Sequence, residues 1–381
     1  MLRGKNIISF SKDWSEDPTS NTHVMSLLAE NNKVLWINSI ATRTPDLTSK
    51  ADVLKIGSKL KKFVGGAREV SKNFWVYTPI VLPFPHSRLA VWLNQQILKA
   101  KIALLRRQLK MNDFQLWTFI PTAEPYIGHL GESLSLYYCT DQYSQFEAVD
   151  TERVVAMEKK LCEKVDLVFA TAHSLVEDKK RWNQNAHLAS HGVNHKHFAQ
   201  AMDDSTPIAD EVANLPGPVL GFFGLMHSWF DQELIRYIAE KKPDWSIALV
   251  GRADVDISRI EGLKNVHLLG RKDYNELPSY CRGFDVGIIP FVVNELTYHV
   301  NPIKLREYLS AGLPVVSTPL PEVRYYDKIC TVADSNEAFL AGLEKELAAD
   351  SPEKRKERCK LMEQETWVAK VEALGRIIDS Q

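Results

Sequence analysis

Short apolar runs alternate with segments of helical periodicity along the chain. In the first half, strands are predicted at residues 6–11, 33–38, 115–120, 135–139, 166–171 and 187–190. In the second half they are predicted at 219–224, 245–251, 265–270, 285–291 and 315–318. Helices are predicted between them, for example at 22–30, 231–242 and 275–283. Such alternation is typical of parallel α/β layers.

A polar stretch interrupts the alternation near the middle of the chain. Residues 200–218, QAMDDSTPIADEVANLPGP, hold few apolar positions, which indicates a linker. We therefore expect an α/β protein with a Rossmann-like domain at 1–198, a linker at 199–217 and a second Rossmann-like domain at 218–350. Helices at 351–381 are expected to cross back to the first domain. Ligands should bind in a cleft between the domains, at the carboxyl ends of the strands.

One stretch of the second half, HVNPIKLREYLSAGLPVVSTPLPEV at 299–323, combines a short helix with a buried strand. Asn301 can cap the helix and Pro302 suits its first position, while Gly312 and Pro314 end it. The helical spacing then assigns the core face to Leu305, Tyr308, Leu309 and Gly312.

Two charged residues share another edge of this predicted helix. Lys304 and Glu307 lie three residues apart, close to the free backbone N–H groups of the helix start. Those amides and Lys304 suit a diphosphate, and Glu307 can accept hydrogen bonds from the two hydroxyls of a ribose. The pattern therefore suits a nucleoside diphosphate. An exposed Lys304–Glu307 surface pair would have the same spacing.

The composition is that of an ordinary globular protein, with 45% hydrophobic and 25% charged residues among 381. The charge is uneven: residues 1–110 carry 18 Lys and Arg against 7 Asp and Glu, and the rest carries 29 against 41. The basic excess gathers in 58–72 and in the amphipathic segment 98–110. Residues 58–110 suit an anionic membrane surface or a phosphate-bearing ligand, although a solvated helix face would look the same. No nucleic-acid-binding module is recognisable.

Five scattered cysteines show no metal-ligand spacing and indicate free thiols in a reducing cytoplasm. No window approaches the roughly 18 apolar residues of a membrane span, and the N-terminus is predicted to be a first strand rather than a signal peptide. We expect a cytoplasmic protein, peripheral on the inner face of the membrane.

The segment that carries Lys304 and Glu307 also resembles a known family. NPIKLREYLSAGLPVVST resembles the donor-site segment of GT-B glycosyltransferases, particularly the retaining family 4 group, also called glycosyl transferases group 1. The second glutamate of that family's motif falls on Glu307, whereas the first falls on His299. The resemblance is specific over about residues 165–325.

The resemblance implies a nucleotide-sugar donor, with UDP as the expected nucleotide. Lys304 would stabilise the departing diphosphate, with Glu307 on the ribose. The remaining expected donor-site residues are His299, Asn301, Pro302, Ile303, Gly224, Leu225, Arg252 and Arg271. The family commonly places an arginine and a lysine after the first strand of this domain, where the chain has Leu225 and Phe230. Arg252 and Arg271 each follow a glycine at a strand end, and each has a surface role as the alternative.

In the first domain, His23 and Asp141 are candidate catalytic residues. Asp141 follows a predicted strand and would act as general base in an inverting enzyme, or position the acceptor in a retaining one. A helix-face histidine and a turn aspartate are the structural alternatives. Expected acceptor-binding residues are Ser20, Asn21, Thr22 and Asp13, with Asp17 a weaker candidate.

The expected activity is transfer of a hexose to a glycan or polyprenyl-linked acceptor in surface polysaccharide biosynthesis, with retention of configuration. No cofactor or metal is expected, because helix amides and lysine can neutralise the diphosphate; the lone DVD at 254–256 is a weak metal signal. A nucleotide-sugar epimerase of the same fold, a non-catalytic transferase homologue and a two-domain sugar-binding protein are the alternatives.

Overall fold

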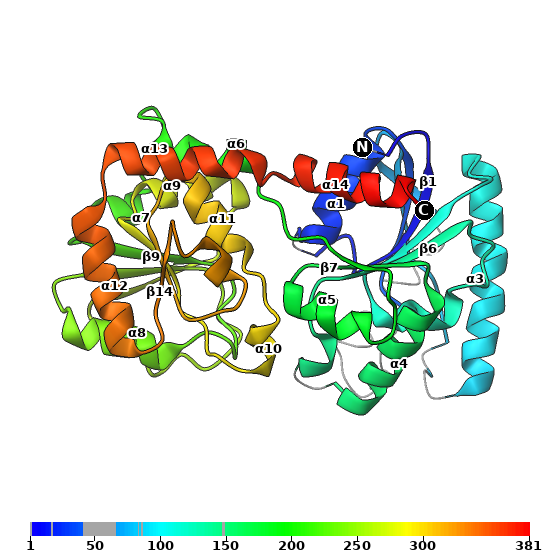
Figure 1. Ribbon diagram of the computed structural model, residues 1–381, viewed down its shortest axis with the longest axis horizontal. Helices are drawn as coiled ribbons and strands as arrows, with labels where there is room; N and C mark the ends of the chain where they lie inside the picture. Colours follow the sequence, from blue (N-terminus) through cyan, green and yellow to red (C-terminus); the bar gives the residue numbers. More distant parts are fainter. Residues whose placement is uncertain (1, 17, 41–65, 83, 85–86, 147–148) are drawn as a thin grey trace. The chain divides into compact units, whose positions relative to one another are not determined.

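The computed structural model describes residues 2–16, 18–40, 66–82, 84, 87–146 and 149–381. Asp17 and the first part of the basic stretch, 58–65, lie outside the described residues. The chain forms two compact units (Figure 1). Unit 1 contains residues 1–190 and 370–381, and unit 2 contains residues 191–369.

Unit 1 is built on a sheet of eight described strands in the order β3-β4-β2-β1-β5-β6-β7-β8, in which only β3 is antiparallel to its neighbour. The strands are β1 Asn6–Phe10, β2 Lys33–Ile37, β3 Arg68–Ser71, β4 Phe74–Tyr77, β5 Gln115–Thr118, β6 Leu134–Cys139, β7 Leu167–Ala170 and β8 Ala186–Leu188. Its helices are α1 Ser20–Ala29, α3 Arg88–Leu109, α4 Thr151–Lys164 and α5 His173–Lys180. The central parallel strands, such as β1, β2 and β7, are largely buried apolar runs, as expected for a sheet covered on both faces.

Unit 2 is built on a parallel sheet of six described strands in the order β11-β10-β9-β12-β13-β14. The strands are β9 Val219–Phe223, β10 Ser246–Val250, β11 Val266–Gly270, β12 Val286–Ile289, β13 Val315–Ser317 and β14 Thr331–Val332. The helices are α6 His195–Phe198, α7 Asp210–Ala213, α8 Gln232–Lys241, α9 Leu277–Arg282, α10 Glu295–Tyr298, α11 Ile303–Ser310, α12 Asn336–Ala349 and α13 Pro352–Leu361. Both sheets confirm the α/β class expected from the sequence.

The segment expected to be a linker, 199–217, is packed inside unit 2. Val212 on α7 is buried, and a Cβ on Gly283 would lie 2.7 Å from its side chain. The backbone N–H of Ala209 donates to the carbonyl of Ser279 on α9 (3.2 Å). The boundary between the units falls at residues 190 and 191 instead, since a few apolar anchors suffice to hold a mostly polar segment against a domain.

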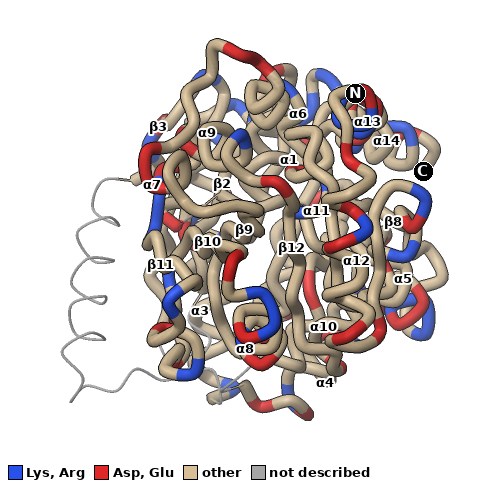
Figure 2. The backbone as a smooth tube through the Cα atoms, turned by 90° about the vertical axis from the view of Figure 1, so that its left-hand side faces the viewer, with Lys and Arg blue, Asp and Glu red and all other residues tan. Residues whose placement is uncertain are grey.

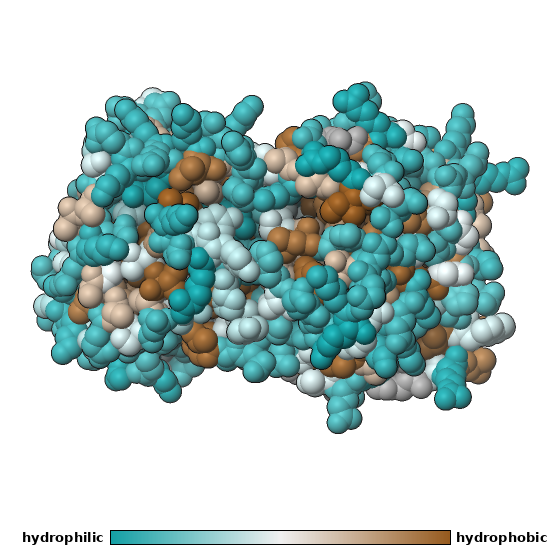
Figure 3. Space-filling model, viewed as in Figure 1, coloured by the Kyte–Doolittle hydropathy of each residue, from teal (hydrophilic) through white to brown (hydrophobic). Residues whose placement is uncertain are grey.

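The last helix, α14 Trp367–Asp379, joins unit 1 from Lys370 onward. Its apolar residues Val371, Leu374 and Ile378 are buried, and Asn185 donates to the side chain of Gln381 (2.8 Å). In the part of the chain that the structure describes, no helix is both long and apolar enough to span a membrane. Hydrophilic residues dominate the visible face of each unit (Figure 3), and around α8 of unit 2 basic and acidic positions are interspersed (Figure 2).

Candidate functional site

The helix α11 is fixed against the carboxyl end of β9 by a buried tyrosine. Tyr308 is fully buried, and its hydroxyl accepts a hydrogen bond from the backbone N–H of Phe223 (3.1 Å). Its ring lies edge-on to that of Phe223, with centroids 4.8 Å apart. A side chain on Gly287 of β12 would collide with the Tyr308 ring, so the glycine allows this close approach. These contacts set the position of every other residue on α11.

Lys304 extends from α11 across the end of β9. Gly224, with a φ of +136°, leaves room for it: a Cβ there would lie 2.3 Å from Cε of Lys304. The ammonium group lies 5.5 Å from the ring centroid of Phe222 and 5.9 Å from that of Phe291. Within the described residues it makes these cation–π contacts but no hydrogen bond or ion pair. Burial lowers the pKa of Lys304, and the nearby Glu307 carboxylate opposes that shift.

Glu307 lies one turn further along α11 and is only partly exposed. Burial raises its pKa to about 7, although the charge of Lys304 acts in the opposite direction. Its carboxylate accepts no hydrogen bond from the residues that the structure describes. The two groups therefore do not form the exposed surface pair that was the structural alternative. A partly buried carboxylate and ammonium without polar partners are suited to a ligand that supplies them.

An aromatic pair near Glu307 was missed by the sequence analysis. Tyr274 stacks on His197, with ring centroids 4.4 Å apart and planes inclined by 15°. Burial raises the pKa of Tyr274, the charge of Glu307 raises it further, and a hydrogen bond with Asn194 lowers it. The two rings come from residues 77 positions apart, and Nε2 of His197 donates to the carbonyl of Tyr274 (2.9 Å). No spacing rule connects such distant residues, so the sequence offered no signal.

The start of α11 differs from the prediction. The helix begins at Ile303 with Pro302 at its N-cap, and Asn301 does not cap it. The Asn301 side chain is buried instead, where Oδ1 accepts from Arg306 (2.8 Å) and Nδ2 donates to Glu322 (3.5 Å). The buried guanidinium of Arg306 thus donates to Oδ1 of Asn301, the oxygen that would otherwise accept from a backbone N–H as a helix cap.

The other expected donor residues of unit 2 are dispersed. Gly224 and Leu225 follow β9 beside Lys304, and His299 follows α10 with its ring edge-on to Tyr298 (5.3 Å). Arg252 is exposed and paired with Asp254 (2.8 Å), which accords with its surface alternative, and Arg271 is exposed after β11. Lys304 is brought together with Gly224 by contact and with Glu307 by charge.

The residue in place of the family's lysine belongs to the core. Phe230 is buried, and its ring centroid lies 5.0 Å from that of Phe222. The loop before it carries a stacked His227–Trp229 pair with centroids 4.5 Å apart. A cation at position 230 would be placed in apolar surroundings, so Lys304 carries the charge at the end of β9.

In unit 1 the helix α1 begins at Ser20, two residues before the predicted start at residue 22. Thr19 is the N-cap and forms a capping box with Thr22. Ser20 and Asn21 are buried in the first turn, because the actual cap leaves them inside the helix. Asp13 is also occupied: its Oδ1 accepts from the backbone N–H (3.0 Å) and hydroxyl (2.8 Å) of Ser39 and so ties the loops after β1 and β2 together.

The two candidate catalytic residues of unit 1 lie at or near the carboxyl ends of strands. Asp141 follows β6, and burial raises its pKa while a hydrogen bond from Thr140 lowers it. His23 lies in the first turn of α1, partly exposed, and burial lowers its pKa. Among the residues that the structure describes, no group of three His, Cys, Asp or Glu side chains is placed to hold a metal ion.

Comparison with known proteins finds similarity to a family within unit 2. Residues 217–349 match the family model of glycosyl transferases group 1. This matched segment lies within unit 2. The chain is also 30% identical over 216 residues to the putative teichuronic acid biosynthesis glycosyltransferase TuaH of Bacillus subtilis (strain 168). The match covers 54% of this chain and 54% of that relative, so this chain matches about half of the relative's length.

Solved glycosyltransferase structures share the GT-B fold of this chain. Sucrose-phosphate synthase from Thermosynechococcus elongatus superimposes with a TM-score of 0.69 at 16% identity, covering 99% of this chain and 98% of that one. Anabaena Alr3699/HepE in complex with UDP gives a TM-score of 0.68 at 11% identity, covering 99% and 100%. These likenesses confirm the fold of two Rossmann-like domains expected from the sequence.

Proposed function

We propose that the protein is a glycosyltransferase that takes a hexose from a nucleoside-diphosphate sugar, with UDP as the nucleotide. The observation that carries this proposal is the pair of unpartnered, partly buried groups on α11, Lys304 and Glu307, at the end of β9. The group 1 domain match supports it. So does the fold shared with HepE, which has been solved with UDP and with UDP-glucose.

In this proposal different residues of α11 bind the diphosphate and the ribose of the nucleotide. The ammonium of Lys304 and the free N–H groups of the helix start stabilise the charge that develops on the leaving diphosphate. Glu307 accepts hydrogen bonds from the ribose hydroxyls. Because the ammonium and the carboxylate have no hydrogen bond or ion pair to give up, neither side chain needs to rearrange before the nucleotide binds. The free-energy cost of removing both groups from water is met when the protein folds. Lys304, His23 and Asp141 are the proposed catalytic residues, the last two on the acceptor side, with no metal.

The proposed acceptor is a glycan or polyprenyl-linked glycan in surface polysaccharide biosynthesis, with retention of anomeric configuration. The relative named for teichuronic acid biosynthesis supports this class of acceptor. We place the protein in the cytoplasm, in peripheral contact with the inner face of the membrane.

The helix α3 supports this membrane contact. None of its 22 residues is acidic and five are basic, and Ala90, Leu98, Ile102 and Leu105 are buried against the sheet. A second apolar set, which we call the outer stripe, is exposed and consists of Leu89, Trp92, Ile97 and Leu104. Leu89 is 66% exposed and Trp92 54%. Apolar residues beside lysines and arginines, with Trp among them, suit the headgroup region of an anionic bilayer.

The transfer reaction is tested by measuring UDP release from UDP-glucose and related UDP-sugars with and without a membrane fraction that supplies acceptors. We expect UDP release that depends on the acceptor, and a product whose anomeric proton shows the donor's configuration by NMR. Free sugar epimer without an acceptor would indicate the epimerase instead. No nucleotide binding of any kind would contradict the donor-site assignment.

A further inference from the structure

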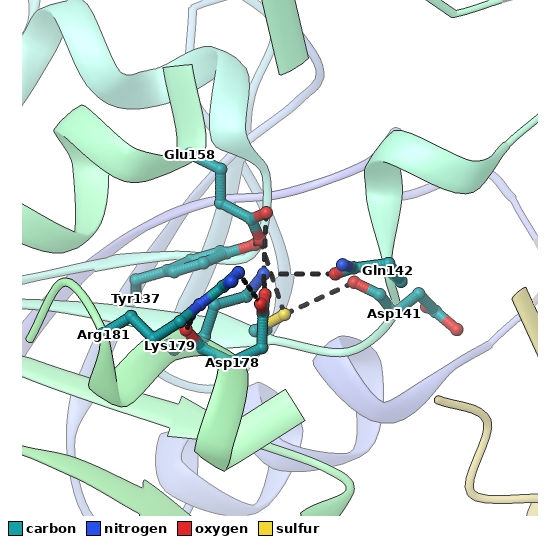
Figure 4. A network of polar contacts seen from close by, with 8 residues as sticks. Tyr137, Asp141, Gln142, Glu158, Asp178, Lys179 and Arg181 are labelled. Carbon is teal, nitrogen blue, oxygen red and sulfur yellow. Dashed lines mark hydrogen bonds and ion pairs between the residues drawn. The ribbon is translucent and has the colours of Figure 1, made fainter. Parts of the chain in front are cut away.

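A fully buried lysine links three elements of unit 1 (Figure 4). Lys179 on α5 donates to Oε2 of Glu158 on α4 and to Oδ2 of its neighbour Asp178, each at 2.8 Å. A third hydrogen bond, of 3.1 Å, goes to the side-chain oxygen of Gln142 in the loop after β6. An ammonium group has three donors, so every one of them is used.

The two carboxylates that bind Lys179 also interact with other residues. Oε1 of Glu158 accepts from the hydroxyl of Tyr137 on β6 (2.6 Å), and Asp178 is also paired with Arg181. Burial alone would lower the pKa of Lys179, but the facing carboxylates keep that pKa above its ordinary value. Lys179 therefore carries its charge at neutral pH.

Stability alone does not account for such a network. Removing two charges from water costs several kcal/mol per ion, and apolar residues of similar volume are often as stable in the same place. What an apolar cluster lacks is a directed bond to the loop. Here the charged network reaches Gln142, the residue directly after the candidate catalytic Asp141.

The loop after β6 is also held by its backbone and by Tyr143, whose hydroxyl donates to the carbonyl of Phe119 (2.6 Å). The carbonyl of Asp141 accepts from the thiol of Cys139 (3.3 Å), and that of Thr140 accepts from the hydroxyl of Thr171 (2.8 Å). Figure 4 shows the Asp141 carboxylate pointing away from the Lys179 network. Gln142 is thus the side chain through which the network reaches the loop, while the Asp141 carboxylate, which accepts a hydrogen bond from Thr140, points away from the network.

We propose that Lys179 is a positioning residue, which acts through Gln142 to hold the loop carrying Asp141 in the orientation that receives the acceptor hydroxyl. The inference rests on the proposed function, because it assigns Asp141 to the acceptor side. It adds two residues, Lys179 and Gln142, that neither the sequence motifs nor the donor site include.

The experiment compares three variants in the full chain. Gln142→Ala cuts the bond to the loop and leaves Lys179 with both carboxylates. The double variant Lys179→Met with Glu158→Gln removes a charge pair together, so no single buried charge is left alone. Tyr138→Phe is the control, since it removes a buried hydroxyl from the same strand whose bond goes to Ala189 (3.0 Å) and not to the loop.

Three quantities are measured: amide hydrogen exchange of residues 140–146, UDP release from UDP-glucose with water as the probe acceptor, and UDP affinity by calorimetry. In the first two variants we expect loop exchange to be about tenfold faster or more, and UDP release to fall about tenfold, since small misplacements of reacting groups have such effects. UDP affinity should stay within about twofold, because the proposed nucleotide residues belong to unit 2.

The outcomes separate the inference from the function. If Gln142→Ala matches Tyr138→Phe in both exchange and UDP release, the positioning role is overturned and the proposed function stands. If the wild type binds no UDP, GDP or ADP, the proposed function is wrong. Exchange of residues 140–146 then decides alone whether Lys179 holds the loop.

Discussion

Two side chains on one edge of α11 account for the proposed donor site. Glu307 has a pKa near 7 because it is buried, and Lys304 has a lowered pKa for the same reason. Neither forms a hydrogen bond or ion pair with the residues that the structure describes, so the cost of removing them from water is not offset by such contacts. A bound nucleotide would supply a hydroxyl donor to one and phosphate oxygens to the other. The proposed nucleotide chemistry of α11 therefore follows from two charged side chains that have no hydrogen-bonding partner among the described residues.

The pKa of Glu307 predicts how nucleotide affinity depends on pH. Only the ionised carboxylate accepts hydrogen bonds at both oxygens, so UDP affinity should weaken as the pH falls through about 7 and change little above it. Titration calorimetry between pH 6 and 8 measures this. The phosphate of UDP also titrates near pH 6, so Glu307→Gln serves as reference. A wild-type pH dependence identical to that of Glu307→Gln would show that Glu307 does not titrate on binding.

At the scale of single elements, glycines decide where α11 and its lysine lie. Gly224 lies under the Lys304 side chain, and a Cβ on Gly251 of the next strand end would lie 1.9 Å from the carbonyl oxygen of Gly224. Both have φ values that side chains rarely adopt, +136° and +149°. The strand ends are therefore shaped so that Lys304 can cross them.

Gly224→Ala should displace Lys304. The new methyl group would lie within 2.6 Å of the ammonium nitrogen, so we expect UDP affinity to fall by about tenfold or more, with some loss of thermal stability from the strained backbone. Gly262→Ala is the matched control, because a Cβ there meets nothing within 4 Å. Equal UDP affinity in the two variants would mean that the position of Lys304 does not matter.

The outer stripe of α3 is also tested as an element. Vesicle flotation should show salt-sensitive binding to bilayers rich in phosphatidylglycerol and little binding to neutral ones. Replacing Trp92 and Leu104 by Ser should weaken binding at any salt concentration, whereas Lys99→Gln with Arg107→Gln should remove mainly its salt dependence, at about 1 kcal/mol per charge. Wild-type protein that does not float with anionic vesicles would remove the proposed contact.

At the scale of the whole molecule, the sequence predicts what depends on continuous apolar runs. Buried parallel strands such as β9 and β10 are such runs and were predicted, whereas β4 and β14 were not, although β4 is an apolar strand parallel to β2. The short strand β3, with the sequence REVS at an antiparallel edge, is polar and was taken as part of a basic surface. The segment 199–217 was misjudged as a linker for the same reason.

The candidate site, too, was predicted only where it depends on residues close together in the sequence. Helical spacing placed Lys304 and Glu307 on one edge, because spacing along a helix fixes direction. It could not show that Arg306 takes Asn301 from the helix cap, or that Tyr274 and His197 stack beside Glu307. Those contacts join distant segments, and only the folded chain determines them.

The central claim is that α11 holds a nucleoside diphosphate, and titration of UDP into the protein tests it most directly. The measurement compares wild type with Lys304→Met, Glu307→Gln and the control Glu233→Gln, an exposed carboxylate of unit 2 that pairs with Arg236 (2.6 Å). We predict that each α11 variant binds UDP about 10- to 100-fold more weakly, the effect of losing a charge-assisted hydrogen bond, and that the control binds as wild type does. Wild-type affinity in both α11 variants would contradict the account.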